Sequence, residues 1–116
     1  MALNMGNMFR NCTSLTSLDL SNFLTTSVSS MTGMFKGCSK LQTLNIKFNT
    51  QKVNNIAEMF AGCEKLESLD LSTFDTRKCL DYDNVFDGCG NLEVVIDKDL
   101  NSDFISTFPE NVHVKE

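Results

Sequence analysis

The strongest constraint on this chain is a repeat of 25 or 26 residues built around cysteine. Cys12, Cys38, Cys63 and Cys89 are separated by 26, 25 and 26 residues. Each has a phenylalanine three positions before it and a leucine three positions after it. A period of this length predicts a solenoid, in which each coil buries its apolar side only against neighbouring coils. The 116 residues hold about four such coils.

Other repeated positions indicate which side chains form the core. The Met and Phe residues that precede each cysteine are expected to be buried rather than to bind a ligand. A threonine recurs two residues after a later phenylalanine, and we expect these threonines to form a column whose hydroxyls bond one another or the turn backbone. They are Thr25, Thr50 and Thr76. The fifth cysteine, Cys79, stands where earlier copies have valine, so we expect it to be a small buried hydrophobe.

The segment 28–38 and its counterparts are predicted to form a short amphipathic helix of two to three turns. Its apolar residues fall at steps of three, three, one and three, which is typical of a helix with one buried face. Residues suited to an N-cap precede it: Ser29 or Ser30, Asn54 or Asn55, and Asp81. A residue suited to the left-handed conformation that ends a helix comes directly before each cysteine: Asn11, Gly37, Gly62 and Gly88.

A short strand is predicted after each cysteine, because apolar and polar residues alternate there. Leu18 and Leu20 are expected to point inward. The outward residues of the first three copies are Ser17, Asp19, Ser21, Thr43, Asn45, Lys47, Ser68, Asp70 and Ser72. The same alignment makes the fourth copy degenerate, with Val94 and Ile96 outward and Asp97 at an apolar position.

These patterns together predict an α/β leucine-rich-repeat solenoid of about four coils. Each coil is expected to contribute a short helix and one strand of a parallel sheet whose outer face is polar. The predicted repeat domain covers residues 1–96, with copies near 5–30, 31–55, 56–81 and 82–96. Residues 97–116 are predicted to form a C-terminal cap, with a last helical turn stopped at Pro109 and a strand at 112–114. The first coil has no capping element in front of Met5.

The sequence contains no recognisable catalytic, cofactor-binding or metal-binding constellation. Coils stacked about 4.8 Å apart spread the four repeated thiols too far for one zinc ion. Disulfides between coils would need closer Cβ atoms than parallel stacking provides. We therefore expect buried free thiols, with an occasional disulfide as the alternative. His113 has no cysteine or carboxylate partner placed by the pattern, so no catalytic role is assigned to it.

Composition excludes several classes of partner. The formal net charge of −5 argues against nucleic acid, since that binding requires cationic groups that neutralise phosphates. No apolar run is long enough to cross a bilayer, so membrane insertion is not expected. The amino terminus shows no basic region followed by an apolar block, so no signal peptide is visible.

The repeat resembles that of a known family. The string Met-x-x-Met-Phe-x-x-Cys-x-x-Leu-x-x-Leu-x-Leu-Ser-x-Phe-x-Thr-x-x-Val runs from Met5 to Val28 and again, with substitutions, from Ile56 to Cys79. It is similar to the BspA-like leucine-rich repeats of bacterial, mycoplasmal and protozoan surface proteins, over roughly residues 5–95. This resemblance implies an interaction module of adhesin or lipoprotein type, and a cell-surface or secreted location.

The leading functional hypothesis is a non-enzymatic protein-binding module whose recognition surface is the outward strand face, comprising the nine residues named above. The identity of the protein partner does not follow from the sequence. One alternative is an assembly unit joined end to end, as a homo-oligomer, through the uncapped first coil or through Val94 and Ile96. Another is a small stand-alone inhibitor or effector acting inside a cell.

Overall fold

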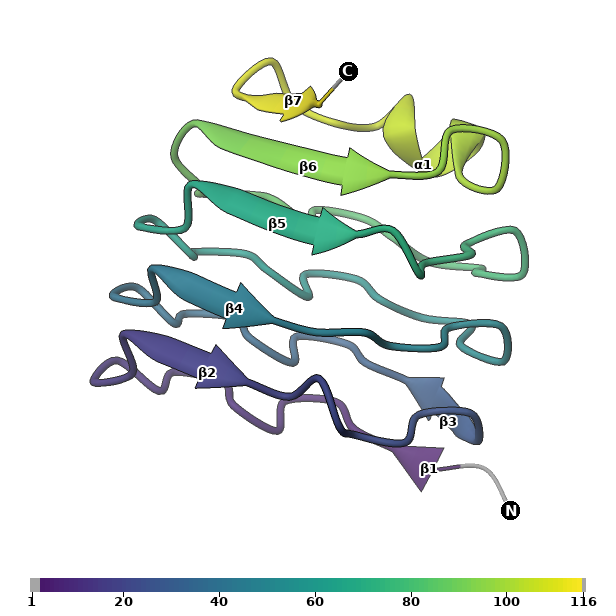
Figure 1. Ribbon diagram of the computed structural model, residues 1–116, viewed down its shortest axis with the longest axis horizontal. Helices are drawn as coiled ribbons and strands as arrows, with labels where there is room; N and C mark the ends of the chain where they lie inside the picture. The colour runs from purple at the N-terminus through teal and green to yellow at the C-terminus, as the bar shows by residue number, and fades with distance from the viewer. Residues whose placement is uncertain (1–2, 116) are drawn as a thin grey trace.

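Each sequence repeat forms one coil of a β-solenoid in the computed structural model, which describes residues 3–115 (Figure 1). The solenoid has about four coils, and its strands are parallel because the chain always winds in the same sense. The predicted solenoid is confirmed. The predicted α/β class is wrong, because the coils contain strands and turns but no helix.

Two hydrogen-bonded sheets lie on the front of the coils in Figure 1. One sheet pairs β2 (Ser17–Asp19) with β4 (Thr43–Asn45). The other orders β5 (Ser68–Leu71), β6 (Leu92–Ile96) and β7 (Val112–Val114). Figure 1 shows β4 beside β5, although the ladder pairing among residues 3–115 does not join them. We call the outward side of these five strands the sheet face.

A second parallel ladder runs along the opposite side of the coils. β1 (Leu3–Asn4) pairs with β3 (Val28–Ser30), and single bridges extend the ladder through Asn55 to Asp81. Asn4, Asn55 and Asp81 each accept, through Oδ1, the backbone N–H two residues later, at 2.7 to 3.0 Å. The residues predicted as N-caps therefore begin turns instead of helices, because a short polar side chain bonds the nearby backbone equally well in an Asx turn.

The predicted helices are replaced by stacked turn segments, one per coil, at residues 5–12, 31–38, 56–63 and 82–89. Within 31–38, the N–H groups of Met34, Lys36 and Cys38 each bond the carbonyl three residues earlier. The intervening N–H groups of Gly33, Phe35 and Gly37 donate to carbonyls of the next coil at 2.8 to 2.9 Å. Hydrogen bonds that would close a helix on itself instead join one coil to the next.

Backbone conformation explains why the helical interpretation failed. Gly37, Gly62, Gly88 and Asn11 have positive φ as predicted. Four residues before each of them, a second residue also has positive φ, and two left-handed residues in five interrupt a right-handed helix. This second set is Asn7, Gly33, Glu58 and Asn84. Apolar side chains at three-residue steps suit consecutive tight turns as well as a helix, so the periodicity alone did not separate the two.

Columns of identical side chains fill the space between the two ladders. Phe9, Phe35, Phe60 and Phe86 stack with ring centroids 5.6 to 5.7 Å apart and planes within 7° of parallel. The predicted methionine and phenylalanine core is confirmed in the inner coils, where Met31, Met34, Phe35, Met59 and Phe60 are fully buried. Each column is completed only by neighbouring coils, which is why one repeat does not fold alone.

The tail after the fourth coil contains α1 (Ser102–Ile105) and β7, and the predicted helical turn and strand are both present. Phe104 is buried and packs against Tyr82 and Phe86, while Phe108 meets Phe86 edge-on at 5.0 Å. The tail therefore covers the end of the phenylalanine column. The domain division at residues 96 and 97 stays a prediction, since the tail packs continuously on the last coil.

Glu58 adopts a left-handed backbone conformation that is unfavourable for a residue with a long side chain. It has φ of 58° in a column where the other coils have Asn or Gly, and a left-handed residue with a long side chain costs about 1 kcal/mol. Its half-buried ion pair with Lys36 offsets only part of that cost. We expect Glu58→Asn to raise the free energy of unfolding by about 0.5 kcal/mol, measured by urea denaturation. Glu58→Gln, which loses the ion pair and keeps the strain, is the control and should be less stable than Glu58→Asn.

Candidate functional site

The nine residues predicted as a recognition surface all lie on or directly after strands of the sheet face. Parallel pairing places Ser17 beside Thr43 and Asp19 beside Asn45. Ser68 and Asp70 lie outward on β5, the next strand along the solenoid. Ser21, Lys47 and Ser72 follow their strands by two residues or fewer. All nine are exposed except Ser21, which is half-buried. The predicted inward pair behaves as expected, with Leu20 buried and Leu18 half-buried.

Local hydrogen bonds hold the two carboxylates of this surface in place. Asp19 Oδ1 accepts the Ser21 N–H at 2.9 Å, and Asp70 Oδ1 accepts the Ser72 N–H at 2.8 Å. Hydrogen bonding from the Ser21 side chain and backbone, with the charge of Lys47, lowers the pKa of Asp19 below its ordinary value. Both aspartates thus keep one oxygen oriented at their own turn and present the other to solvent, so the surface is ordered before any partner binds.

The fourth strand differs from the sequence prediction by one residue. Val94 and Ile96 are buried, while Glu93 and Val95 point outward. The reason is that the fourth coil is one residue shorter before its strand: Leu69 pairs with Val94, six and five residues after their cysteines. A shift of one residue exchanges the two faces of a strand. The predicted outward pair Val94 and Ile96 is therefore wrong, and Ile96 fills the apolar position that had been assigned to Asp97.

The corrected register enlarges the sheet face with residues that sequence reasoning missed. A shallow hollow of about 200 Å³ is lined by Ser68, Leu69, Asp70, Glu93, Val95 and Lys115. Val95 is 40% exposed between Asp70 and the strand β7. His113 is exposed opposite Glu93, and Lys115 Nζ lies 4.0 Å from Glu93 Oε1. The alternation of Glu93 with buried Leu92 and Val94 was the available signal for this register.

The thiols form a ladder of structural hydrogen bonds. Cys38, Cys63 and Cys89 each donate through Sγ to a phenylalanine carbonyl of the preceding coil, at 3.1 to 3.3 Å. All five cysteines are free, as expected, but only Cys38 and Cys63 are buried, and Cys12, Cys79 and Cys89 are half-buried. Burial raises the pKa of Cys38 and Cys63, and raises the pKa of Cys79 and Cys89 to about 11. These four thiols are therefore protonated at neutral pH, which makes them poor nucleophiles and poor metal ligands.

The threonine column is equally structural. Thr25 and Thr50 donate through their hydroxyls to a backbone carbonyl of the next coil, at 3.1 and 3.0 Å. Each hydroxyl also accepts the backbone N–H of that same residue in the next coil. Thr76 has no further repeat beyond it and instead bonds the side chain of Asn101 through both its N–H and its hydroxyl. Asn101 follows Thr76 by 25 residues, so the repeat period was the signal that could have identified it.

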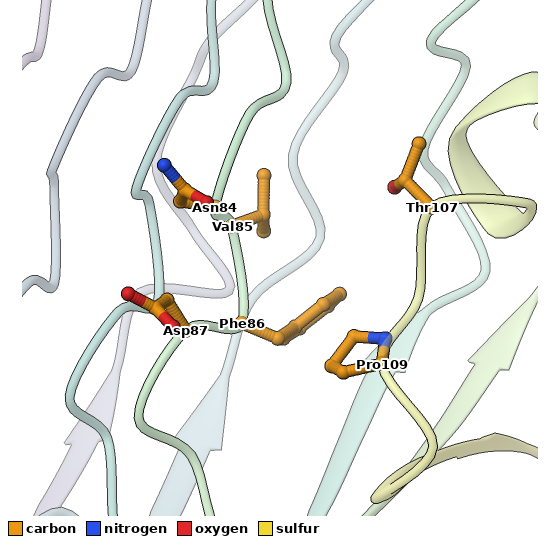
Figure 2. A pocket seen from close by; sticks show the side chains of 6 residues that line it. All are labelled: Asn84, Val85, Phe86, Asp87, Thr107 and Pro109. Carbon is orange, nitrogen blue, oxygen red and sulfur yellow. The ribbon is translucent and has the colours of Figure 1, made fainter.

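A small hollow lies where the tail meets the fourth coil. Figure 2 shows Asn84, Val85, Phe86 and Asp87 on one side and Thr107 and Pro109 on the other, around a space of about 140 Å³. In the two preceding coils, the N–H groups equivalent to those of Asn84, Phe86 and Gly88 donate to the next coil. Within residues 3–115 no further coil follows, so these N–H groups face the tail. The hollow is a gap between the packed tail and the fourth coil, and Asp87 is the carboxylate that lines it.

Other kinds of site are not formed by the described residues. Between residues 3 and 115, no three His, Cys, Asp or Glu side chains are grouped closely enough to ligate a metal ion. That same range contains no helix with the length and apolar character needed to span a bilayer.

Comparison with known proteins gives one match. The profile of a family described as "Mycoplasma protein of unknown function, DUF285" matches residues 3–108. Searches of curated proteins and of solved structures found no significant similarity.

Proposed function

Since the chain belongs to the DUF285 family of Mycoplasma proteins of unknown function, we propose for it a function that its geometry supports: non-enzymatic protein binding through the sheet face. The observation that carries this proposal is the register of the outward side chains. Asp19 beside Asn45, followed by Asp70 and Val95, forms a row of exposed side chains on parallel strands. A continuous surface of this type is where solenoid proteins bind partners.

The composition of the row supports a protein partner. Hydroxyls, carboxylates, an amide and Lys47 offer donors and acceptors, and Val95 adds an apolar contact beside the hollow next to Asp70. The carboxylates repel nucleic-acid phosphates. The match of the string from Met5 to Val28 further supports our placing the repeat among the BspA-like leucine-rich repeats, with the adhesin-like role that this resemblance implies.

The test is to replace acidic and amide side chains of this row by cations. Asp19→Arg, Asn45→Arg and Asp70→Arg together place three bulky cations on the sheet face, and we expect capture of the protein partner to fall at least a hundredfold. Because all three side chains are exposed, circular dichroism should change little, and loss of the hydrogen bonds from Ser21 to Asp19 and from Ser72 to Asp70 should lower the urea midpoint only modestly. Partners are first isolated by pull-down with the unmodified chain, and affinity is then measured for each variant.

The matched control makes the same change of charge on the turn side. Asp83→Arg, Asp87→Arg and Asn54→Arg replace exposed residues on the opposite side of the coils, away from the sheet face. This control should bind as the unmodified chain does. If the control loses affinity and the sheet-face variant keeps it, the binding surface is the turn side and the proposal is wrong.

A further inference from the structure

Within residues 3–115, the outer sides of the first coil and of the tail leave different surfaces exposed. Columns that are fully buried in the middle of the molecule become exposed at the first coil: Met8 is 48% exposed and Phe23 is 40% exposed, whereas Met34 and Phe48 are fully buried. We call this outer side of the first coil the N-terminal end, and the outer side of the tail the C-terminal end. At the C-terminal end the apolar residues Ile105, Phe108 and Val114 are half-buried.

Both ends also carry the edge of a parallel sheet. β2 pairs with β4 and β7 pairs with β6, so within residues 3–115 each has one free edge. The two strands run in the same direction in Figure 1. A copy moved along the solenoid axis without rotation would therefore place its β2 beside β7 of the first copy, and the parallel ladder would continue from one molecule to the next.

Charge distribution favours the same arrangement. Residues 3–55 contain five Lys or Arg and one Asp, whereas residues 81–115 contain two Lys and eight Asp or Glu. The N-terminal half is thus positive and the C-terminal half negative along the axis. Coils lie about 4.8 Å apart, which is shorter than the Debye length of about 8 Å at physiological salt. Opposite ends of two copies would attract each other, and like ends would repel.

Backbone polarity argues against contact between two N-terminal ends. In the turn segments, the carbonyls of Thr32, Met34 and Lys36 point toward the first coil and accept its N–H groups at 2.7 to 2.9 Å. The equivalent carbonyls of Gly6, Met8 and Arg10 therefore point outward from the N-terminal end. Two such ends in contact would oppose acceptor to acceptor, which disfavours contact between two N-terminal ends.

We propose that this protein associates with a second copy of itself head to tail, with β2 of one molecule against β7 of the next. Because the two surfaces are different, the contact is heterologous and does not close on itself, so association continues into linear chains. The proposal is independent of binding at the sheet face, whose outward side chains remain accessible in such chains.

Proline substitutions block each end separately. Successive residues of a strand direct their N–H groups to opposite sides. Leu20 N–H donates to Asn45 of β4, so Ser17, an odd number of residues away, directs its N–H away from β4. Lys115 N–H donates to Val94 of β6, so Val114 directs its N–H away from β6. Proline removes that N–H and is tolerated on a strand edge facing solvent. Ser17→Pro thus blocks the N-terminal end and Val114→Pro the C-terminal end, and Ser17→Ala and Val114→Ala keep the N–H as matched controls.

Sedimentation equilibrium provides the test. The unmodified chain should show a weight-average mass that rises above 13.0 kDa with concentration and does not level off at the dimer. Each proline variant alone should associate at least tenfold more weakly, whereas an equimolar mixture of the two should form dimers. The alanine controls should behave as the unmodified chain. Circular dichroism of each variant checks that it is folded.

Other outcomes would overturn the proposal. If Val114→Pro alone dimerises and Ser17→Pro does not, the contact joins two N-terminal ends. If the unmodified chain stays at 13.0 kDa at every concentration, there is no such assembly. Salt dependence gives a measurement that needs no variant: raising the salt concentration should weaken association of the unmodified chain, and a mass that grows with salt would contradict head-to-tail contact between opposite charges.

Discussion

Replacement of Phe60 by alanine is expected to lower the free energy of unfolding by about 4 kcal/mol, the usual range for a fully buried phenylalanine being 3 to 5 kcal/mol. Phe60 has no exposed surface and stacks between Phe35 and Phe86, with centroid distances of 5.6 and 5.7 Å. The cavity lies between coils, where stacked backbones prevent collapse into it. Since domains of this size are stable by only about 5 to 15 kcal/mol, the variant should lose a large share of its free energy of unfolding.

Position in the column is the control for that experiment. Phe9 occupies the same place in the first coil but is half-buried and stacks only on Phe35. Phe9→Ala should therefore cost about half as much as Phe60→Ala or less, and Phe60→Leu, which keeps most of the apolar volume, about 1 kcal/mol. Urea unfolding followed by circular dichroism measures all three. Equal losses for Phe9→Ala and Phe60→Ala would show that stacking between coils does not determine the stability of the column.

Asn101→Ala is expected to cost about 3 kcal/mol, although it removes only a small polar group. Asn101 is buried, and its Oδ1 accepts the N–H and the hydroxyl of Thr76 at 2.9 and 2.7 Å. Its Nδ2 donates to the carbonyls of Phe74 and Asp97, both at 2.9 Å. Alanine would leave these groups without partners, and each buried unsatisfied group costs about 1 to 3 kcal/mol.

Two comparisons separate this effect from general loosening of the tail. Asn111 also donates two hydrogen bonds, to Cys89 and Gly90, but it is half-buried, so Asn111→Ala should cost about 1 kcal/mol. Thr76→Val combined with Asn101→Ala should be less destabilising than the sum of the single changes, because the hydroxyl left without a partner is then absent. Additive losses, or a larger loss for Asn111→Ala, would contradict a specific role of Asn101 in ending the threonine column.

Much of the fold could be predicted from spacing. The columns of cysteine, phenylalanine and threonine, the strands of the first three coils and the left-handed residues before the cysteines are all found where the repeat places them. These features depend on side-chain environments that recur with the period, and the period can be identified directly in the sequence. The nine residues of the candidate surface follow from the same alternation, and the structure places them on one face.

Features that depend on single residues were harder to predict. One residue fewer before β6 turned Val94 inward and Glu93 outward, and only the alternation around Glu93, not the repeat spacing, marks that deletion. The exposed Val95 and the hollow near Asp70 became part of the candidate surface only through that register. The role of Asn101 does not follow from the repeat pattern, because the asparagine continues the period of the threonines but not their residue type.

By itself, the sequence determined that the chain is a solenoid, how many coils it has and which side chains share a column. Residues that recur every 25 or 26 positions occupy equivalent environments, and this holds for any backbone conformation between them. Only the tertiary structure decided that the turn segments are not helices. The three-residue step of Met31 and Met34 is compatible with a helix and with consecutive tight turns. Turns form because the N–H groups of Gly33, Phe35 and Gly37 bond carbonyls of the next coil rather than of their own. Such partners exist only once the coils are stacked.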